Sequence, residues 1–217
     1  MDNFGLYIVM TNPLLGYETF TEICVQEEVP MLQIRDKHLS DRELLNLCKR
    51  LKAITEGSKT RFIVDDRPDI CLLTKADGLH LGQDDLPWKE VLPFLPNNTL
   101  LGVSTHNLKQ AKELMESITA KTNLQKPDYF SFGPIYPTVA KEKPDPAIGV
   151  EDLKTVLNLS PIPVVAIGGL FPENLPNVLA VGAQNMAFIR HFTLSRETAE
   201  LKAKIREMKS LLKEAQK

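Results

Sequence analysis

The chain of 217 residues has little of what marks several large classes of protein. Its only cysteines are Cys24, Cys48 and Cys71, too few and too far apart for a disulfide scaffold or for the usual spacing of a zinc site. We expect them to be reduced and buried. No apolar run approaches membrane-spanning length, and the first residues lack the basic and apolar segments of a signal peptide. We therefore expect a cytoplasmic protein with no membrane partner.

Charge of one sign is not in excess either. The chain has 26 Lys and Arg against 28 Asp and Glu, which gives a net charge of −2. Proteins that bind nucleic acid through the phosphate backbone usually present a basic face. This composition argues against a nucleic-acid partner, and any anion site must be local.

What the chain does have is a strict alternation of short apolar runs with helical patterns. The helical segments include residues 40–54, where Ser40 is placed to cap the helix, and 106–118; the last begins at Ser195. Alternating strands and helices require parallel pairing. Eight such units predict one α/β domain, a single-domain (β/α)8 TIM barrel over residues 1–217, with an open doubly wound sheet as the main rival. The predicted strands are 5–10, 31–35, 61–65, 78–82, 100–104, 129–133, 163–168 and 185–190.

In such a barrel the loops that follow the strands build the active site. At the end of the second strand, Gln33, Arg35 and Lys37 alternate with Ile34 and Asp36, so the two groups face opposite sides. If Ile34 faces the helices, the polar row faces the mouth of the barrel and its two cations indicate an anion. The same row is also compatible with a solvated edge that binds nothing.

Two acidic clusters follow the third and fourth strands. Asp65 and Asp66 end the run FIVDD, and Asp84 and Asp85 end the run GLHLGQDD. Taken alone, each cluster is typical of a turn or a helix start. At adjacent strand ends they offer the oxygen ligands that Mg²⁺ takes alongside water and phosphate. His80, inside the fourth strand, is expected to be packed rather than to bind metal.

The remaining strand ends carry further groups suited to phosphate. Ser104 and His106 follow the fifth strand, and Ser104 is placed to hydrogen-bond a phosphate. The loop after the sixth strand, 135–149, is long enough to be functional and presents Thr138 and Lys141. Gly168 and Gly169 follow the seventh strand, where we expect the lack of side chains to let backbone N–H groups approach a ligand.

Six motifs occur in the order and approximate spacing of the thiamine phosphate synthase/TenI family, which the chain resembles over about residues 5–192. They are QIRDK, VDDR, ADGLHLGQDD, GVSTH, GPIYPTVAK and VVAIGGL. The resemblance implies that hydroxymethylpyrimidine diphosphate and hydroxyethylthiazole phosphate, both small-molecule substrates, are joined to give thiamine phosphate and pyrophosphate. It also implies a Mg²⁺ cofactor and a dissociative, carbocation-like step.

The resemblance also assigns site residues. Asp66 and Asp85 are implied as the metal ligands, with Asp84 facing away. Arg35, Ser104 and Lys141 are implied as catalytic groups. The implied substrate-binding positions are Gln33, Ile34, Asp36, Lys37, Asp65, Thr138, Ala140, Gly168, Gly169, Ile189 and Arg190.

Three positions depart from the family pattern. Asp65 stands where asparagine is usual, and Ala140 stands where a second threonine is common. Arg190-His191-Phe192 replaces the small residues that usually follow the eighth strand. Arg190 is suited to clamping a phosphate, but it is equally suited to filling the site or forming a salt bridge.

Two alternatives therefore stay open, a TenI-type thiazole tautomerase and a catalytically silent, phosphate-binding regulatory barrel. The intact GQ-x-D pattern on the fourth strand favours the synthase. We expect the amphipathic C-terminal helix to cover the bottom or flank of the barrel, and a homodimer is possible.

Overall fold

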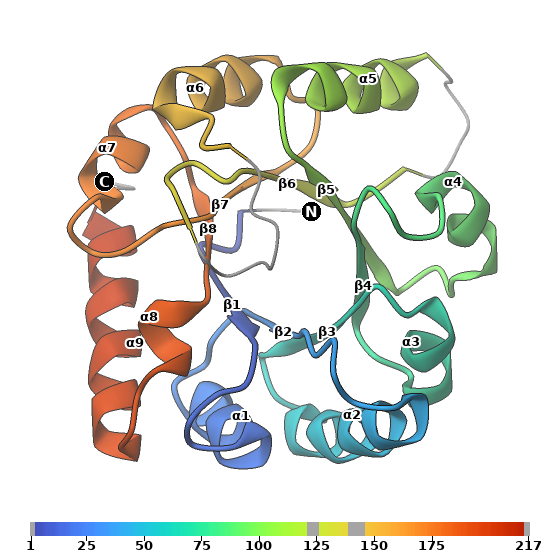
Figure 1. Cartoon of the computed structure of the whole chain (residues 1–217), viewed down its shortest axis with the longest axis vertical. Coiled ribbons are helices and arrows are strands. Elements are labelled where there is room, and N and C mark those ends of the chain that lie inside the picture. Colours follow the sequence, from blue (N-terminus) through green and yellow to red (C-terminus); the bar gives the residue numbers. More distant parts are fainter. Residues whose placement is uncertain (1–2, 121–125, 139–145, 215–217) are drawn as a thin grey trace.

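The computed structural model describes residues 3–120, 126–138 and 146–214. Its eight strands are all parallel and form a closed barrel in the order of the sequence (Figure 1). This confirms the predicted (β/α)8 barrel and excludes the open sheet. The strands are β1 Leu6–Met10, β2 Met31–Ile34, β3 Arg61–Asp65, β4 Gly78–Leu81, β5 Leu100–Thr105, β6 Tyr129–Phe132, β7 Val164–Ile167 and β8 Asn185–Phe188.

The helices surround the barrel in Figure 1. They are α1 Tyr17–Gln26, α2 Asp41–Thr55, α3 Pro68–Thr74, α4 Trp88–Val91, the 3₁₀ turn η1 Leu92–Phe94, α5 Leu108–Thr119, α6 Gly149–Leu159, α7 Leu175–Ala180, α8 Arg190–Thr193 and α9 Thr198–Glu214. Ser40 caps α2 as expected, in a capping box with Glu43. None of the helices in the described residues is both long and apolar enough to cross a membrane.

The alternation of side chains along each strand creates two separate apolar layers. In β1, Leu6, Ile8 and Met10 pack outward under the helices, whereas Tyr7 and Val9 face the inside of the barrel. The outer layer is almost entirely aliphatic and aromatic, so its burial supplies the hydrophobic stabilisation of the fold. The inner layer is small and leaves room for polar groups near the mouth.

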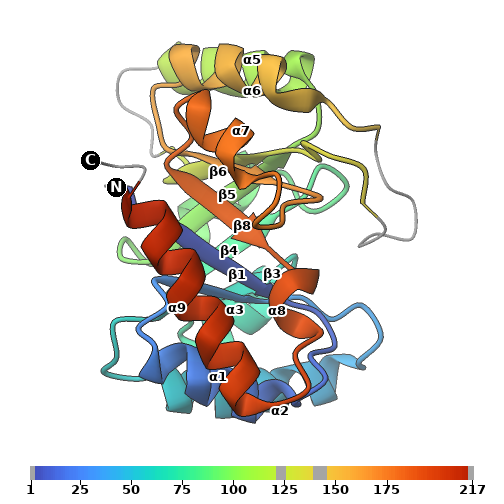
Figure 2. The ribbon, with the colours of Figure 1, turned by 90° about the vertical axis from the view of Figure 1, so that its left-hand side faces the viewer.

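The C-terminal helix α9 lies on the flank of the barrel, as the sequence predicted (Figure 2). Leu201, Ile205 and Met208 form its fully buried stripe. Arg206 also forms a two-pronged ion pair with Glu27, which follows α1. The flank position closes the ring of helices between α8 and α1 and leaves the mouth of the barrel open.

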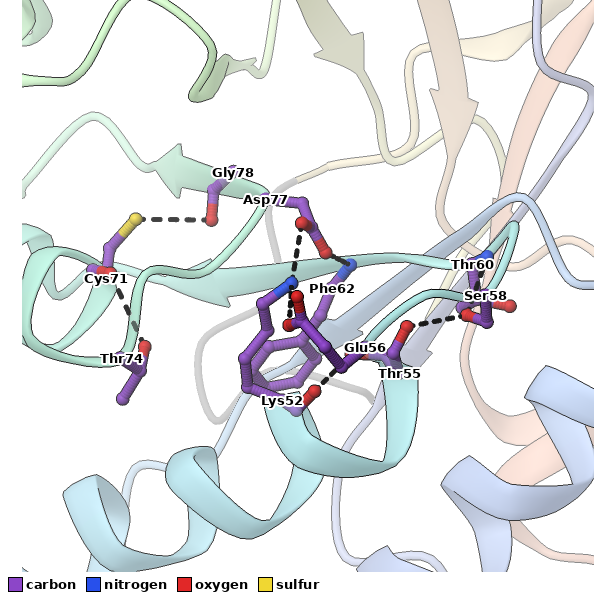
Figure 3. A network of polar contacts seen from close by, with 10 residues as sticks. All are labelled: Lys52, Thr55, Glu56, Ser58, Thr60, Phe62, Cys71, Thr74, Asp77 and Gly78. Atoms are coloured by element: carbon purple, nitrogen blue, oxygen red, sulfur yellow. Dashed lines mark hydrogen bonds and ion pairs between the residues drawn. The ribbon is translucent and has the colours of Figure 1, made fainter.

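At the bottom of the barrel, polar side chains tie neighbouring strands together. Asp77, just before β4, accepts a hydrogen bond from the backbone N–H of Phe62 in β3 at 2.8 Å and another from Lys52 of α2 at 2.8 Å (Figure 3). Asp128, before β6, accepts from the N–H of Leu101 in β5 at 2.8 Å. These contacts satisfy backbone donors that the ladder leaves unpaired.

Most strands differ from their predicted bounds by one or two residues, and at the ends of β7 and β8 the reason is local. The seventh strand ends at Ile167 rather than at residue 168, because Gly168 has a φ of 97° that extended backbone does not adopt. The eighth ends at Phe188 rather than at residue 190, because Arg190 begins the short helix α8. Arg190 is therefore a helix-start residue and not the end of a strand.

Candidate active site

The mouth of the barrel contains a cavity of about 360 Å³. Side chains from all eight strands reach it, so the strands aim at one site as the fold predicts. Among the sequence-predicted residues, those that line the cavity are Gln33, Arg35, Asp65, Ser104, Thr138, Gly168, Gly169, Ile189 and Arg190.

The floor of this cavity is a set of hydrogen-bonded polar side chains. The Tyr7 hydroxyl donates to Gln33 Oε1 at 2.7 Å and lies 2.9 Å from the Tyr129 hydroxyl. His80 uses both ring nitrogens, with Nδ1 3.2 Å from the Tyr129 hydroxyl and Nε2 2.9 Å from Ser104 Oγ. His80 is thus a packed histidine, as expected, but it also lines the cavity.

Sequence reasoning missed the two tyrosines of this floor. Tyr7 and Tyr129 are fully buried, and each occupies an inward-facing position of its strand. The alternation of side chains that placed Gln33 inward would also have placed them inward. Burial raises the pKa of each phenol, so both hydroxyls keep their protons.

Asp65 is held between the floor and the cationic row. Its Oδ1 accepts from Gln33 Nε2 at 2.6 Å, and its Oδ2 lies 3.4 Å from Arg35 Nε. Burial, with a further contribution from the neighbouring Asp66, raises the pKa of this carboxyl well above its usual range. The additional carboxylate that the sequence left open is therefore paired and directed toward Arg35.

The carboxyls of Asp66 and Asp85 lie close enough for each to shift the pKa of the other, so the two acidic clusters come together at the mouth. Asp66 has a φ of 60°, in the left-handed region that Asp adopts more readily than most residue types. Its carboxyl also forms an ion pair with Lys37. Asp85 accepts from the N–H of Gly82 at 2.6 Å, whereas Asp84 is exposed.

This contact couples the two carboxyls electrostatically. Burial and the Asp66 carboxyl raise the pKa of Asp85 to about 6. Burial alone would also raise the pKa of Asp66, but hydrogen bonds with Asp85 and Lys37 outweigh it and lower that pKa. Two carboxyls in contact that favour sharing a proton are suited to sharing a cation instead, and Mg²⁺ commonly takes one or two protein carboxylates. No group of three or more His, Cys, Asp or Glu side chains in the described residues is arranged to hold a metal.

The opposite side of the cavity is formed by the ends of β7 and β8. Gly168 and Gly169 both have positive φ, and a Cβ on Gly169 would lie 2.7 Å from the Cβ of Tyr136. These glycines let the chain after β6 pack against the end of β7, where the N–H of Tyr136 donates to Gly168 O at 3.0 Å. Protein atoms therefore fill the space that a side chain would occupy, while both glycines line the cavity, so the approach of a ligand to their backbone N–H groups stays a prediction.

A family model described as thiamine monophosphate synthase matches residues 6–192 of this chain. The chain belongs to this family. The thiamine-phosphate synthase of Moorella thermoacetica is 32% identical over 211 residues, which cover 96% of this chain and 97% of that protein. The thiamine-phosphate synthase of Archaeoglobus fulgidus is 33% identical and covers 89% of each chain.

Solved structures agree with this assignment. The thiamine phosphate pyrophosphorylase of Pyrococcus furiosus is 28% identical, with a TM-score of 0.83 over 98% of this chain and 97% of that chain. A 3-hexulose-6-phosphate synthase, 15% identical with a TM-score of 0.62, shares the fold alone. The relatives are enzymes of thiamine phosphate synthesis, so this chain belongs to an enzyme family.

Within the thiamine monophosphate synthase family, the departure after β8 is less disruptive than the sequence suggested. Phe192 is fully buried in the outer core, and the His191 ring packs at 4.8 Å from it and at 6.3 Å from Phe171. Only Arg190 of the three lines the cavity, and it is exposed. Within the described residues, its guanidinium forms no ion pair.

Other predicted site residues lie elsewhere. Ile34 is buried in the outer layer, as its alternation with Gln33 predicted. Asp36 accepts from the Tyr17 hydroxyl at 2.8 Å and from the N–H of His38 at 2.8 Å, and so fixes the loop after β2. Neither side chain lines the cavity. Ala140 and Lys141 lie outside the described residues.

Proposed function

We propose that this chain joins 4-amino-5-hydroxymethyl-2-methylpyrimidine diphosphate to 5-(2-hydroxyethyl)-4-methylthiazole phosphate in the presence of Mg²⁺. The products are thiamine phosphate and pyrophosphate. The observation that carries the proposal is the paired carboxyls of Asp66 and Asp85, which lie with Lys37 at the end of the polar row of β2. In a chain of this family, that arrangement suits a diphosphate bound through a cation.

The residues present fit a Mg²⁺ ion. Asp66 and Asp85 would hold it, because they follow neighbouring strands and their carboxyls lie close enough to shift each other's pKa. When bound, the ion supplies positive charge beside the diphosphate. Lys37 is the cation nearest to this pair, and Arg35 follows on the same face of β2.

The step itself requires little proton transfer. The bond between the pyrimidine methylene carbon and the diphosphate oxygen breaks, and pyrophosphate leaves with the electron pair. The thiazole nitrogen then donates its lone pair to the methylene carbon. Arg35, Lys37 and, outside the described residues, Lys141 stabilise the charge on the leaving group. The floor residues Gln33 and Ser104 bind the pyrimidine half.

The second substrate is assigned to the side of the cavity formed by β7 and β8. Thr138, Gly168, Gly169, Ile189 and Arg190 line it. A hydroxyl, backbone N–H groups and a guanidinium that has no ion pair in the described residues are suitable partners for a phosphate. Gln33 and Arg35 line the opposite side of the same cavity, whereas Lys37, Asp66 and Asp85 lie outside its lining. A diphosphate held by these three groups and extending toward Arg35 would bring the methylene carbon and the thiazole nitrogen close together. Cytoplasmic location and a homodimer stay predictions from the sequence.

The experiment that tests the proposal measures thiamine phosphate and pyrophosphate together, with both substrates, in the presence of Mg²⁺ and after its removal with a chelator. We expect both products to form in equal amounts with Mg²⁺ and neither without it. Asp85→Asn is expected to abolish most of the activity, whereas Asp84→Asn, at the exposed neighbour, is the matched control. A folded protein that makes no thiamine phosphate would overturn the proposal and return the tautomerase and the silent barrel to consideration.

A further inference from the structure

The floor of the cavity is one continuous chain of hydrogen bonds that the proposed reaction does not explain. It crosses the inside of the barrel from β6 to β3 through Ser131, Ser104, His80, Tyr129, Tyr7, Gln33 and Asp65. Gly102 makes room for it, since a Cβ there would lie 2.5 Å from His80 Nδ1 and would also collide with Tyr129. Each hydroxyl in this hydrogen-bond chain has one proton to donate, so the donor-to-acceptor order at one end fixes the order along the rest.

The donor-to-acceptor order of the hydrogen bonds is fixed at the Asp65 end. In its ionised form, which the charges of Arg35 and Lys37 favour against burial, this carboxyl has acceptors alone, and both of its oxygens face donors, Gln33 Nε2 at 2.6 Å and Arg35 Nε at 3.4 Å. An oxygen that accepts from an amide fixes that amide, so Gln33 turns its Nε2 to Asp65 and its Oε1 toward Tyr7. The Gln33 oxygen then requires a donor, and the Tyr7 hydroxyl supplies it at 2.7 Å.

The two tyrosines continue the same donor-to-acceptor order across the barrel. The Tyr7 hydroxyl uses its one proton in the hydrogen bond to Gln33, so at its 2.9 Å contact with Tyr129 it accepts. The Tyr129 hydroxyl then uses its proton in the hydrogen bond to Tyr7, so at its 3.2 Å contact with His80 Nδ1 it also accepts. Both phenols are buried and keep their protons, which makes this the consistent assignment.

The same order continues through His80 and determines which way the Ser104 hydroxyl proton points. Nδ1 of His80 donates to Tyr129, and in a neutral imidazole Nε2 is then an acceptor. Ser104 Oγ, 2.9 Å away, donates its proton to Nε2, while Ser131 Oγ donates to Ser104 at 3.4 Å. The hydroxyl proton of Ser104 is therefore turned away from the cavity.

We propose that Asp65 is a positioning residue that orients this chain, so that His80 is the Nδ1–H tautomer and Ser104 offers the ligand an acceptor rather than a donor. The sequence expectation for Ser104 was the opposite, a donor to phosphate. The consequence for the substrate rests on the proposed function: a group of the pyrimidine half that contacts Ser104 is recognised as a donor, such as an N–H. The tautomer of His80 does not depend on that function.

The experiment is NMR of the ¹⁵N-labelled metal-free protein, in which long-range correlations between ring protons and nitrogens distinguish the two tautomers. The chain has four histidines, and the His80 signals are assigned by their loss in His80→Gln. We expect Nδ1 of His80 to be protonated and Nε2 not. An Nε2–H tautomer or a doubly protonated ring in the unsubstituted protein would overturn the proposal.

Two variants test the part played by the chain. Asp65→Asn introduces the residue usual in this family, which is compatible with the fold, but its amide no longer fixes the direction of Gln33. We expect the single His80 tautomer to be lost, and Tyr7→Phe to have the same effect by removing the middle link. Asp66→Asn neutralises the adjacent carboxyl, which is not part of the hydrogen-bond chain. It is the matched control and should leave the tautomer of His80 unchanged. A Nδ1–H tautomer that persists in either Asp65→Asn or Tyr7→Phe contradicts the proposal, whether or not the protein makes thiamine phosphate.

Discussion

The two ends of this barrel use acidic side chains in opposite ways. At the bottom, Asp77 and Asp128 each accept from one backbone N–H of the neighbouring strand, and Asp77 also pairs with Lys52 (Figure 3). At the mouth, Asp66 and Asp85 touch each other instead. The bottom carboxylates are separated and bind donors of neighbouring elements, whereas those at the mouth lie against each other, although Asp85 also accepts from Gly82 N–H and Asp66 pairs with Lys37.

This difference between the two ends of the barrel indicates that the bottom carboxylates serve stability and the mouth carboxylates serve function. A carboxylate with dedicated donors contributes to folding, and its removal leaves those donors unsatisfied. Like-charged groups in contact gain nothing for the fold and become useful when a cation or an anionic ligand arrives. The predictions below test this division, from the largest expected effect to the smallest.

The largest effect is expected for Asp66→Asn at the mouth. Loss of one of the two paired carboxylates should lower kcat/KM for thiamine phosphate formation on the order of 10²–10³-fold, as for other groups that stabilise charge in the transition state. The free energy of unfolding of the metal-free protein should change little, because loss of the ion pair with Lys37 offsets removal of the like-charge contact. Steady-state kinetics and urea unfolding measure the two quantities, and a marked loss of stability would contradict the division.

The opposite pattern is expected for Asp77→Ala at the bottom. The N–H of the fully buried Phe62 loses its acceptor and Lys52 keeps only Glu56, so the free energy of unfolding should fall by about 1–3 kcal/mol. At a temperature where the variant is folded, kcat/KM should stay within about twofold of the unsubstituted value. Asp84→Ala, at an exposed position, is the matched control for stability.

Much of this arrangement could be predicted from the sequence, because it follows from periodicity. The order of elements, the inward face of Gln33 and the meeting of Asp66 with Asp85 all depend on which residues alternate and where strands end. Tyr7 and Tyr129 were equally predictable as inward residues, but nothing in the sequence shows that their hydroxyls meet. That contact depends on residues 122 positions apart along the chain.

The role of the Gly168-Gly169 pair was not predictable for another reason. A glycine pair after a strand indicates that something comes close, but it does not say what. Here the close neighbour of Gly169 is the chain at Tyr136 and Pro137, which also contributes to the cavity wall. The position of Arg190 was missed in a similar way, because the start of α8 within two residues of β8 depends on a local change of backbone direction at Ile189.

A smaller effect, confined to one substrate, is expected for Arg190→Ala. A charge-assisted hydrogen bond to phosphate contributes about 1.5–3 kcal/mol, so KM for the thiazole phosphate should rise roughly tenfold or more. KM for the pyrimidine diphosphate should change little, since Arg190 lies on the β8 side of the cavity. Arg196→Ala, at an exposed residue outside the cavity lining, is the control. Equal changes in both KM values would contradict separate anion sites.

The smallest expected effect is a change in titration rather than in rate. In the metal-free protein, Asp85 should titrate near pH 6, because burial and the neighbouring Asp66 raise its pKa. A carboxyl whose folded-state pKa exceeds its unfolded value binds more protons in the folded protein, so stability falls as the pH rises from about 4 to 6. Asp66→Asn should move the pKa of Asp85 back toward the ordinary value and weaken this dependence, and Mg²⁺ should also lower that pKa. Carbon-detected NMR of the side-chain carboxyls measures the pKa directly. An ordinary pKa for Asp85 in the unsubstituted, metal-free protein would mean that the two carboxyls do not share a site, and the comparison between the ends of the barrel would lose its main support.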